Sequence, residues 1–172
     1  MTSDPNGQSN DQAAAIAADV EEGRRHPAGI SGNFLYLVAL SWTLFQFWYA
    51  SPLPFALNFG VFNDGEARAI HLAFALLLAF AAFPAFKGSP RDHVPVVDWS
   101  LAVVGLMATF YLLFFRDALA DRAGAPIFAD LVVGSVGLAV LLEATRRAVG
   151  PPLLVVALVF LTYSLVGPWM PE

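Results

Sequence analysis

The residues that could do chemistry in this chain are ionisable side chains within, or at the ends of, long apolar runs. They are Arg68, His71, Asp98 with its neighbour Trp99, Asp130, Glu143, Arg146 and Arg147. Ionisable groups inside membrane spans are rare, face protein or water, and often belong to ion paths or proton relays. Each of these residues is therefore a candidate for a functional or a structural role.

His71 is the histidine inside an apolar run, and it is the candidate for proton transfer. Arg68 and His71 share one helical face with Ala75, Ala79 and Ala82, because these residues recur every three or four positions. The structural alternative, which we favour, is that Arg68 extends to the outer headgroups and His71 makes an interhelical hydrogen bond.

Two aspartates lie near the ends of apolar runs. Asp98 precedes Trp99 at the start of the third run and could cap that helix. Asp130 lies one turn into the fourth run, where Arg116 or Arg122 could pair with it. In the same run, Gly134 and Gly137 predict a face that packs closely against another helix.

The segment Glu143-Ala-Thr-Arg-Arg147 is a dense charge cluster between two apolar runs. Glu143 is placed to pair with Arg146 at i+3 and with Arg147 at i+4. We expect these pairs to neutralise the acid and to anchor the end of the helix at the membrane surface. A role in docking a partner is the alternative.

No known catalytic motif is present: there is no Gly-x-Ser-x-Gly, no phosphate-binding loop and no His-Glu-x-x-His. The chain has no cysteine, and a haem held between helices would need a second membrane histidine at the depth of His71. We expect no enzyme activity, no catalytic residue, and no metal or cofactor bound by this chain. No basic face suggests nucleic acid as a partner.

Composition indicates an all-α, polytopic membrane bundle. Of the 172 residues, 58% are hydrophobic and 13% are charged, whereas soluble domains carry about 25% charged residues. A run of about 20 apolar residues crosses a bilayer. Five such runs predict five transmembrane helices, with four as the alternative count if the last two runs form a re-entrant pair or the first lies on the surface. The expected helices are 31–50, 67–86, 96–115, 126–145 and 151–167, within a membrane domain of residues 30–172.

Residues 1–29 are polar and are expected to form a largely disordered cytoplasmic tail. With the N-terminus inside, six Lys and Arg residues fall in inner segments and three in outer ones. The inner six are Arg24, Arg25, Lys87, Arg91, Arg146 and Arg147, and the outer three are Arg68, Arg116 and Arg122. This bias predicts a cytoplasmic N-terminus and an external C-terminus.

The predicted outer loop, Ser51–Glu66, is apolar but broken by prolines and glycines, so it cannot span the membrane. We expect it to lie at the membrane interface. The alternative is a docking surface for a partner.

Several stretches follow one another in an order typical of one family. They are Arg68-Ala-Ile-His71-Leu-Ala-Phe, Phe83-Pro84, Val97-Asp98-Trp99, Gly124-Ala-Pro126 with Asp130, Leu142-Glu143-Ala-Thr-Arg-Arg147 with Gly150, and Tyr163-Ser-Leu-Val-Gly167-Pro168. Together they resemble the small (Q-type, four-helix-like) membrane-subunit region of TRAP transporters of the TAXI type. The resemblance covers roughly residues 35–171.

The resemblance implies a part in solute import. TRAP transporters are secondary importers, typically driven by sodium, that receive substrate from an extracytoplasmic substrate-binding protein. Their large permease subunit holds the ion and substrate sites, so sodium is expected there and not on this chain. The small subunit supports the large one in the cytoplasmic (inner) membrane of bacteria or archaea. The resemblance assigns no substrate contact to the residues of this chain.

On this interpretation the candidate residues are structural. Arg68 and His71 fix the second helix near its outer end, whereas Asp98, Glu143, Arg146 and Arg147 anchor the cytoplasmic side. The chain could be a separate subunit or a piece of a fused permease. The alternatives from other classes are a membrane anchor or a redox or proton-handling subunit of an enzyme complex, centred on His71, and a small transporter that acts alone.

Overall fold

The computed structural model describes residues 23–25, 27, 29–86 and 88–167. Regular structure in this part of the chain is helical throughout, as predicted. Its helices are α2 (Gly29–Ala50), α3 (Leu53–Leu57), α4 (Asp64–Ala82), α5 (Val96–Phe114), α6 (Arg116–Asp121), α7 (Phe128–Ala148) and α8 (Pro151–Val166). Most of the expected tail (residues 1–22, 26 and 28) and Lys87 lie outside the described residues.

Four helices, α2, α4, α5 and α7, are long and apolar enough to cross a membrane. All five predicted apolar helices are present, but the last of them, α8, has only 16 residues. At 1.5 Å per residue it is about 24 Å long, somewhat less than a bilayer core of about 30 Å. The protein is thus a small polytopic helical membrane protein with four candidate spans and a shorter apolar helix packed against the last of them.

The second predicted helix has different ends, for local reasons. α4 begins at Asp64, three residues before the expected start, because Asn63 and Glu66 form a reciprocal capping box. The Glu66 amide donates to Asn63 Oδ1 at 2.9 Å, and the Asn63 amide donates to Glu66 Oε2 at 2.9 Å. The helix ends at Ala82 instead of residue 86, since Pro84 disfavours helical backbone at Phe83, which is extended.

The fourth predicted helix is shifted toward the C-terminus. Pro126 was expected to open it, but α7 begins at Phe128, and the Asp130 carboxylate accepts the free amide of Ile127 at 3.1 Å. α7 then continues to Ala148, three residues beyond the expected end, so the whole charge cluster lies in its last two turns. Gly150, with a φ of 100° that favours glycine, ends the segment before Pro151 opens α8.

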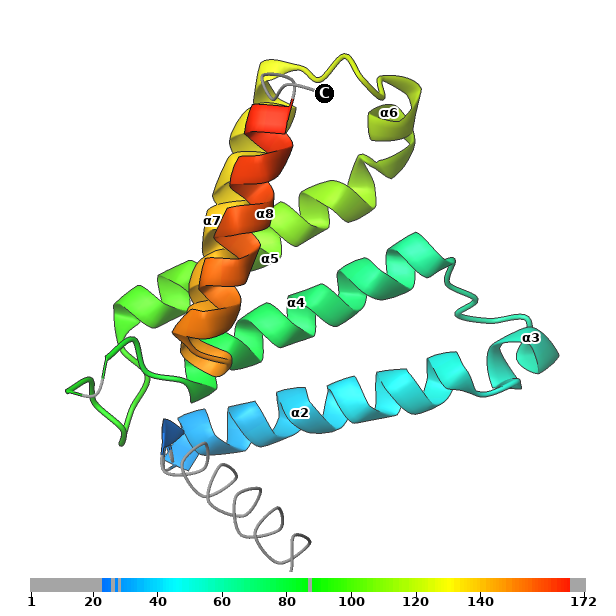
Figure 1. Ribbon diagram of the computed structural model, residues 1–172. Helices are drawn as coiled ribbons and strands as arrows, with labels where there is room; N and C mark the ends of the chain where they lie inside the picture. The colour runs from blue at the N-terminus through cyan, green and yellow to red at the C-terminus, as the bar shows by residue number, and fades with distance from the viewer. Residues whose placement is uncertain (1–22, 26, 28, 87, 168–172) are drawn as a thin grey trace, which may run out of the picture.

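Two short helices interrupt the connections after α2 and after α5 and were not predicted. α3 lies inside the apolar loop after α2, and α6 follows α5 directly. Figure 1 shows both at the same end of the bundle, the end opposite to the start of α2. In α3 and the loop that follows, Phe55 and Phe59 are exposed, which fits a segment that contacts lipid or a partner.

α4 is the centre of the bundle. It packs against α5 most extensively and also contacts α2 and α7, whereas α8 lies antiparallel beside α7 (Figure 1). The buried core lies where α4, α5 and α7 meet, and it consists of Leu76, Ala79, Phe80, Ala102, Val140 and Ala144. Three of its six residues are alanine, a small residue that lets helices approach closely in lipid.

The outer helices α2 and α8 bury none of their described residues. Large apolar side chains such as Phe47 of α2 and Phe160 of α8 are 72% and 67% exposed. Within a bilayer these faces contact lipid tails or another protein.

Candidate functional site

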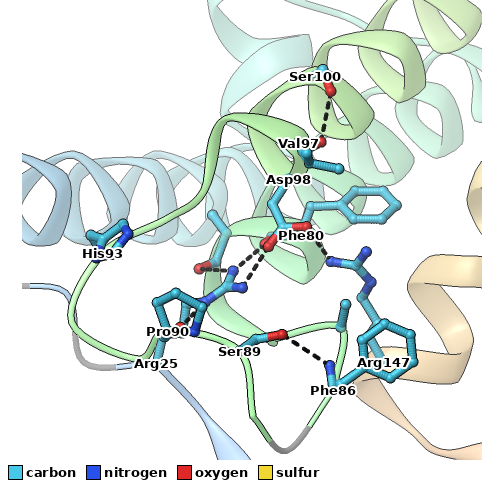
Figure 2. A network of polar contacts seen from close by, with 12 residues as sticks. Arg25, Phe80, Phe86, Ser89, Pro90, His93, Val97, Asp98, Ser100 and Arg147 are labelled. Atoms are coloured by element: carbon cyan, nitrogen blue, oxygen red, sulfur yellow. Dashed lines mark hydrogen bonds and ion pairs between the residues drawn. The ribbon is translucent and has the colours of Figure 1, made fainter.

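Three buried charged side chains and two half-buried ones form what we call the Asp98 cluster, made of Arg25, Asp98, Arg147, Glu143 and Arg146. These residues come from the segment before α2, the first turn of α5 and the last two turns of α7. Figure 2 shows Arg25 and Arg147 approaching Asp98 from two sides. The cluster therefore joins three parts of the chain that are far apart in sequence.

Asp98 does not cap α5, contrary to the prediction. The N-cap position belongs to Pro95, and Asp98 follows it as the third residue of the helix, 4% exposed. Its Oδ2 lies 2.5 Å from Arg25 Nη2, and its Oδ1 lies 2.7 Å from Arg147 Nη1. A buried carboxylate needs such partners, because removing it from water costs several kcal/mol.

Arg25 is a member of the cluster that the sequence interpretation missed, since it placed this residue in the tail. Its side chain is fully buried. Besides Asp98, it donates from Nη1 to the Phe80 carbonyl at 2.9 Å and from Nε to the Pro90 carbonyl at 3.0 Å. Its backbone amide donates to the Ala82 carbonyl at 2.7 Å. The carbonyls of Phe80 and Ala82 belong to the last turn of α4. Carbonyls in the last turn of a helix have no amide donors within the helix, and the negative end of the helix dipole lies there, so a cation such as Arg25 is favourable at this position.

The predicted pairing of Glu143 with both arginines is confirmed. Arg146 Nη2 and Arg147 Nε each lie 2.7 Å from Glu143 Oε1. Arg147 also reaches Asp98, which spacing along α7 could not show. Both guanidinium groups lie over aromatic rings, Arg147 at 5.0 Å from the Phe80 centroid and Arg146 at 5.3 Å from that of Phe86. Such contacts add cation–π stabilisation to the ion pairs.

The Asp98 cluster satisfies its own hydrogen-bonding needs. In the part of the chain that the structure describes, no buried side-chain nitrogen or oxygen lacks a partner. Arg146 Nη2 also donates to the Ala85 carbonyl, at 3.1 Å. The buried donors and acceptors of the Asp98 cluster are thus committed to one another and to the backbone, an arrangement that holds helices together.

A second group, the Asp130 cluster, lies at the opposite end of α5 and consists of Tyr111, Arg122 and Asp130. Of the two arginines proposed as partners, Arg122 pairs with Asp130, through two contacts of 2.7 Å. These hydrogen bonds raise the pKa of Arg122, so its guanidinium stays charged. Arg116 pairs instead with Glu66, at 2.7 Å. The Tyr111 hydroxyl donates to Asp130 Oδ1 at 2.5 Å, a contact that the sequence interpretation missed.

Arg68 and His71 belong to neither cluster. Arg68 is exposed and pairs with Asp64 one turn away at 2.9 Å. His71 makes the predicted interhelical hydrogen bond: Trp42 Nε1 of α2 donates to its Nδ1 at 3.3 Å, and Gln46 Nε2 also contacts that atom. His71 thus connects α4 to α2.

Trp99 and the glycines of α7 contribute to packing. The ring centroids of Trp99 and Phe34 are 5.5 Å apart, so this aromatic contact links α5 to α2. A Cβ on Gly137 would lie 3.2 Å from Ala108, so this glycine does allow close packing, whereas Gly134 faces open space. A closer approach between helices is at Gly105, which was not singled out, where a Cβ would lie 3.0 Å from Leu76.

Within the described residues, no group of three His, Cys, Asp or Glu side chains could hold a metal ion. The chain matches no family model, no curated protein and no solved structure.

Proposed function

We propose that this protein is the non-catalytic, small membrane subunit of a binding-protein-dependent importer of the TRAP (TAXI) type, and that it supports a larger permease subunit. Sodium and solute are then handled by that larger subunit, and an extracytoplasmic binding protein delivers the solute. The ordered motifs from Arg68 to Pro168 are the sequence basis of this proposal.

The observation that carries the proposal is the position of the charges. Acids and arginines pair with one another in two clusters at opposite ends of the bundle, and the pairs Arg68–Asp64 and Arg116–Glu66 lie at the same end as the Asp130 cluster. Between these ends, α5 from Trp99 to Phe114 and α7 from Leu131 to Leu142 carry no charged side chain. Transporters that move solutes place polar groups near the membrane midplane, so this arrangement favours a supporting role.

The exposed faces of α2 and α8 support the same role. Helices that bury nothing within their own chain leave continuous apolar surfaces available to a second membrane protein. Four of the large side chains on these surfaces, Leu44, Phe47, Phe160 and Leu165, are at least 60% exposed.

Native co-purification tests the proposal. The chain should be tagged at its own locus, extracted in a mild detergent and analysed for partners by mass spectrometry. We expect one multi-helix permease at a stoichiometric amount, encoded together with a secreted binding protein. A stable monomer without a larger permease would contradict the proposal, and so would solute uptake by the lone chain in proteoliposomes.

A further inference from the structure

A groove of about 700 Å³ separates α2 from α4. Its walls are apolar and are formed by Leu35, Ala39 and Trp42 of α2 and by Ala75, Ala79 and Ala82 of α4. The face of α4 that carries these alanines therefore lines the groove. The volume is within the range of about 300–1,000 Å³ typical of ligand sites.

One end of the groove is basic. Arg24 and Arg25 both border it there. Arg25 is buried and paired with Asp98, but Arg24 is exposed, lies 6.0 Å from the Phe83 ring centroid, and forms no ion pair among the described residues. Among the described residues, Arg24 and the Asp98 cluster together hold four guanidinium groups and two carboxylates, a surplus of two positive charges within this group.

The groove is therefore complementary to an amphiphilic molecule, because its walls are apolar along their length and one end carries a cation. The basic end is at the level where α4 ends and α5 begins, which for membrane-spanning helices is the headgroup region. Basic pockets between transmembrane helices recognise the phosphate groups of anionic lipids. A partner helix would fit the apolar walls but would leave the surplus charge without a counterpart.

We infer that the groove binds the acyl chain of an anionic phospholipid, with its phosphate on Arg24. This inference is independent of the proposed transport function, because it rests on the groove and its charge alone. The lipid would fill the gap between α2 and α4. Further along the same two helices, the hydrogen bond from Trp42 to His71 connects them directly. Binding it stabilises the association of α2 with the rest of the bundle.

Lipid exchange in nanodiscs tests the inference. The purified chain is reconstituted with phosphatidylcholine or with added phosphatidylglycerol, and thermal unfolding and lipid adducts in native mass spectrometry are recorded. We expect phosphatidylglycerol to raise the unfolding temperature and to be retained in preference to phosphatidylcholine. Arg24→Gln should weaken this retention about fivefold, the effect of one basic residue at an anionic surface.

Two further variants make the result specific. Ala39→Trp adds bulk from an exposed position of α2 and should abolish the phosphatidylglycerol effect without removing a charge. Arg68→Gln removes one positive charge at the other end of α4 and should leave the effect unchanged. Equal responses of Arg24→Gln and Arg68→Gln, or equal stabilisation by the two lipids, would overturn the inference. Displacement of a co-purified partner subunit by Ala39→Trp, with no lipid effect, would instead assign the groove to a partner helix.

Discussion

Arg147, in the last turn of α7, reaches Asp98, in the first turn of α5, across 2.7 Å, and both side chains are at most 5% exposed. The pair joins the end of one span to the start of another. Arg25 pairs with the second oxygen of the same carboxylate. Three parts of the chain therefore meet at Asp98: the segment that precedes α2, helix α5 itself, and the end of helix α7.

We predict that Asp98→Asn strongly destabilises the protein, because it leaves two buried arginines without their shared counter-ion. Breaking a buried ion pair from one side costs about 3–5 kcal/mol. Unfolding in detergent, followed by tryptophan fluorescence, measures the loss. Asp64→Asn is the matched control, since its exposed pair with Arg68 is expected to contribute at most about 1 kcal/mol. Similar losses for the two variants would show that Asp98 is not central.

The two neighbouring arginines of α7 should differ in their contributions. The Arg147 side chain is 3% exposed and bridges two acids, whereas that of Arg146 is 28% exposed and pairs with Glu143 alone. Arg147→Met should therefore lower the free energy of unfolding by about 3 kcal/mol or more, and Arg146→Met by about 1 kcal/mol. The reverse order in the same unfolding assay would contradict the assigned contacts.

At the opposite end, Tyr111→Phe should cost about 1.5–3 kcal/mol, the usual contribution of a hydrogen bond to a charged group. Asp130→Asn should cost more, because Arg122 then loses its carboxylate. In a double-mutant cycle the two effects should be non-additive, since both variants disrupt the same contact. Additive losses would mean that Tyr111 and Asp130 act independently.

Two glycines provide a paired test of helix packing. A Cβ at Gly105 would lie 3.0 Å from Leu76 and 3.2 Å from Val140, so Gly105→Ala should destabilise the core by about 1–3 kcal/mol. Gly134 has nothing within 4 Å, so Gly134→Ala should be neutral or stabilise the helix by up to about 1 kcal/mol. Thermal unfolding of both variants measures the difference. Equal stability would argue against the α4–α5–α7 contact.

The helices could be predicted because each depends on its own run of residues. Apolar length and the i+3 and i+4 spacing of Glu143 with its arginines are local, and these expectations were confirmed. Helix ends were less predictable because single capping contacts set them, as at Asn63.

The non-local contacts could not be predicted. Arg25 and Asp98 are 73 residues apart, and nothing in the spacing of either residue indicates the other. Tyr111 reads as one aromatic residue among many in an apolar run, so its bond to Asp130 became visible only with the fold. An acid within an apolar run indicates that a basic partner exists, but it does not indicate which residue that partner is.

The central claim, that a larger membrane protein covers the exposed faces of this bundle, is tested most directly by photo-crosslinking in the native membrane. A photoreactive phenylalanine replaces Phe47 of α2 or Phe160 of α8, and Phe86, equally exposed but in the loop after α4, serves as the control. We predict that at least one of the two helix positions gives a covalent adduct with a multi-helix permease and that the loop position gives none. Adducts with lipid alone from both helix positions, with the chain remaining at its monomer mass, would contradict the account.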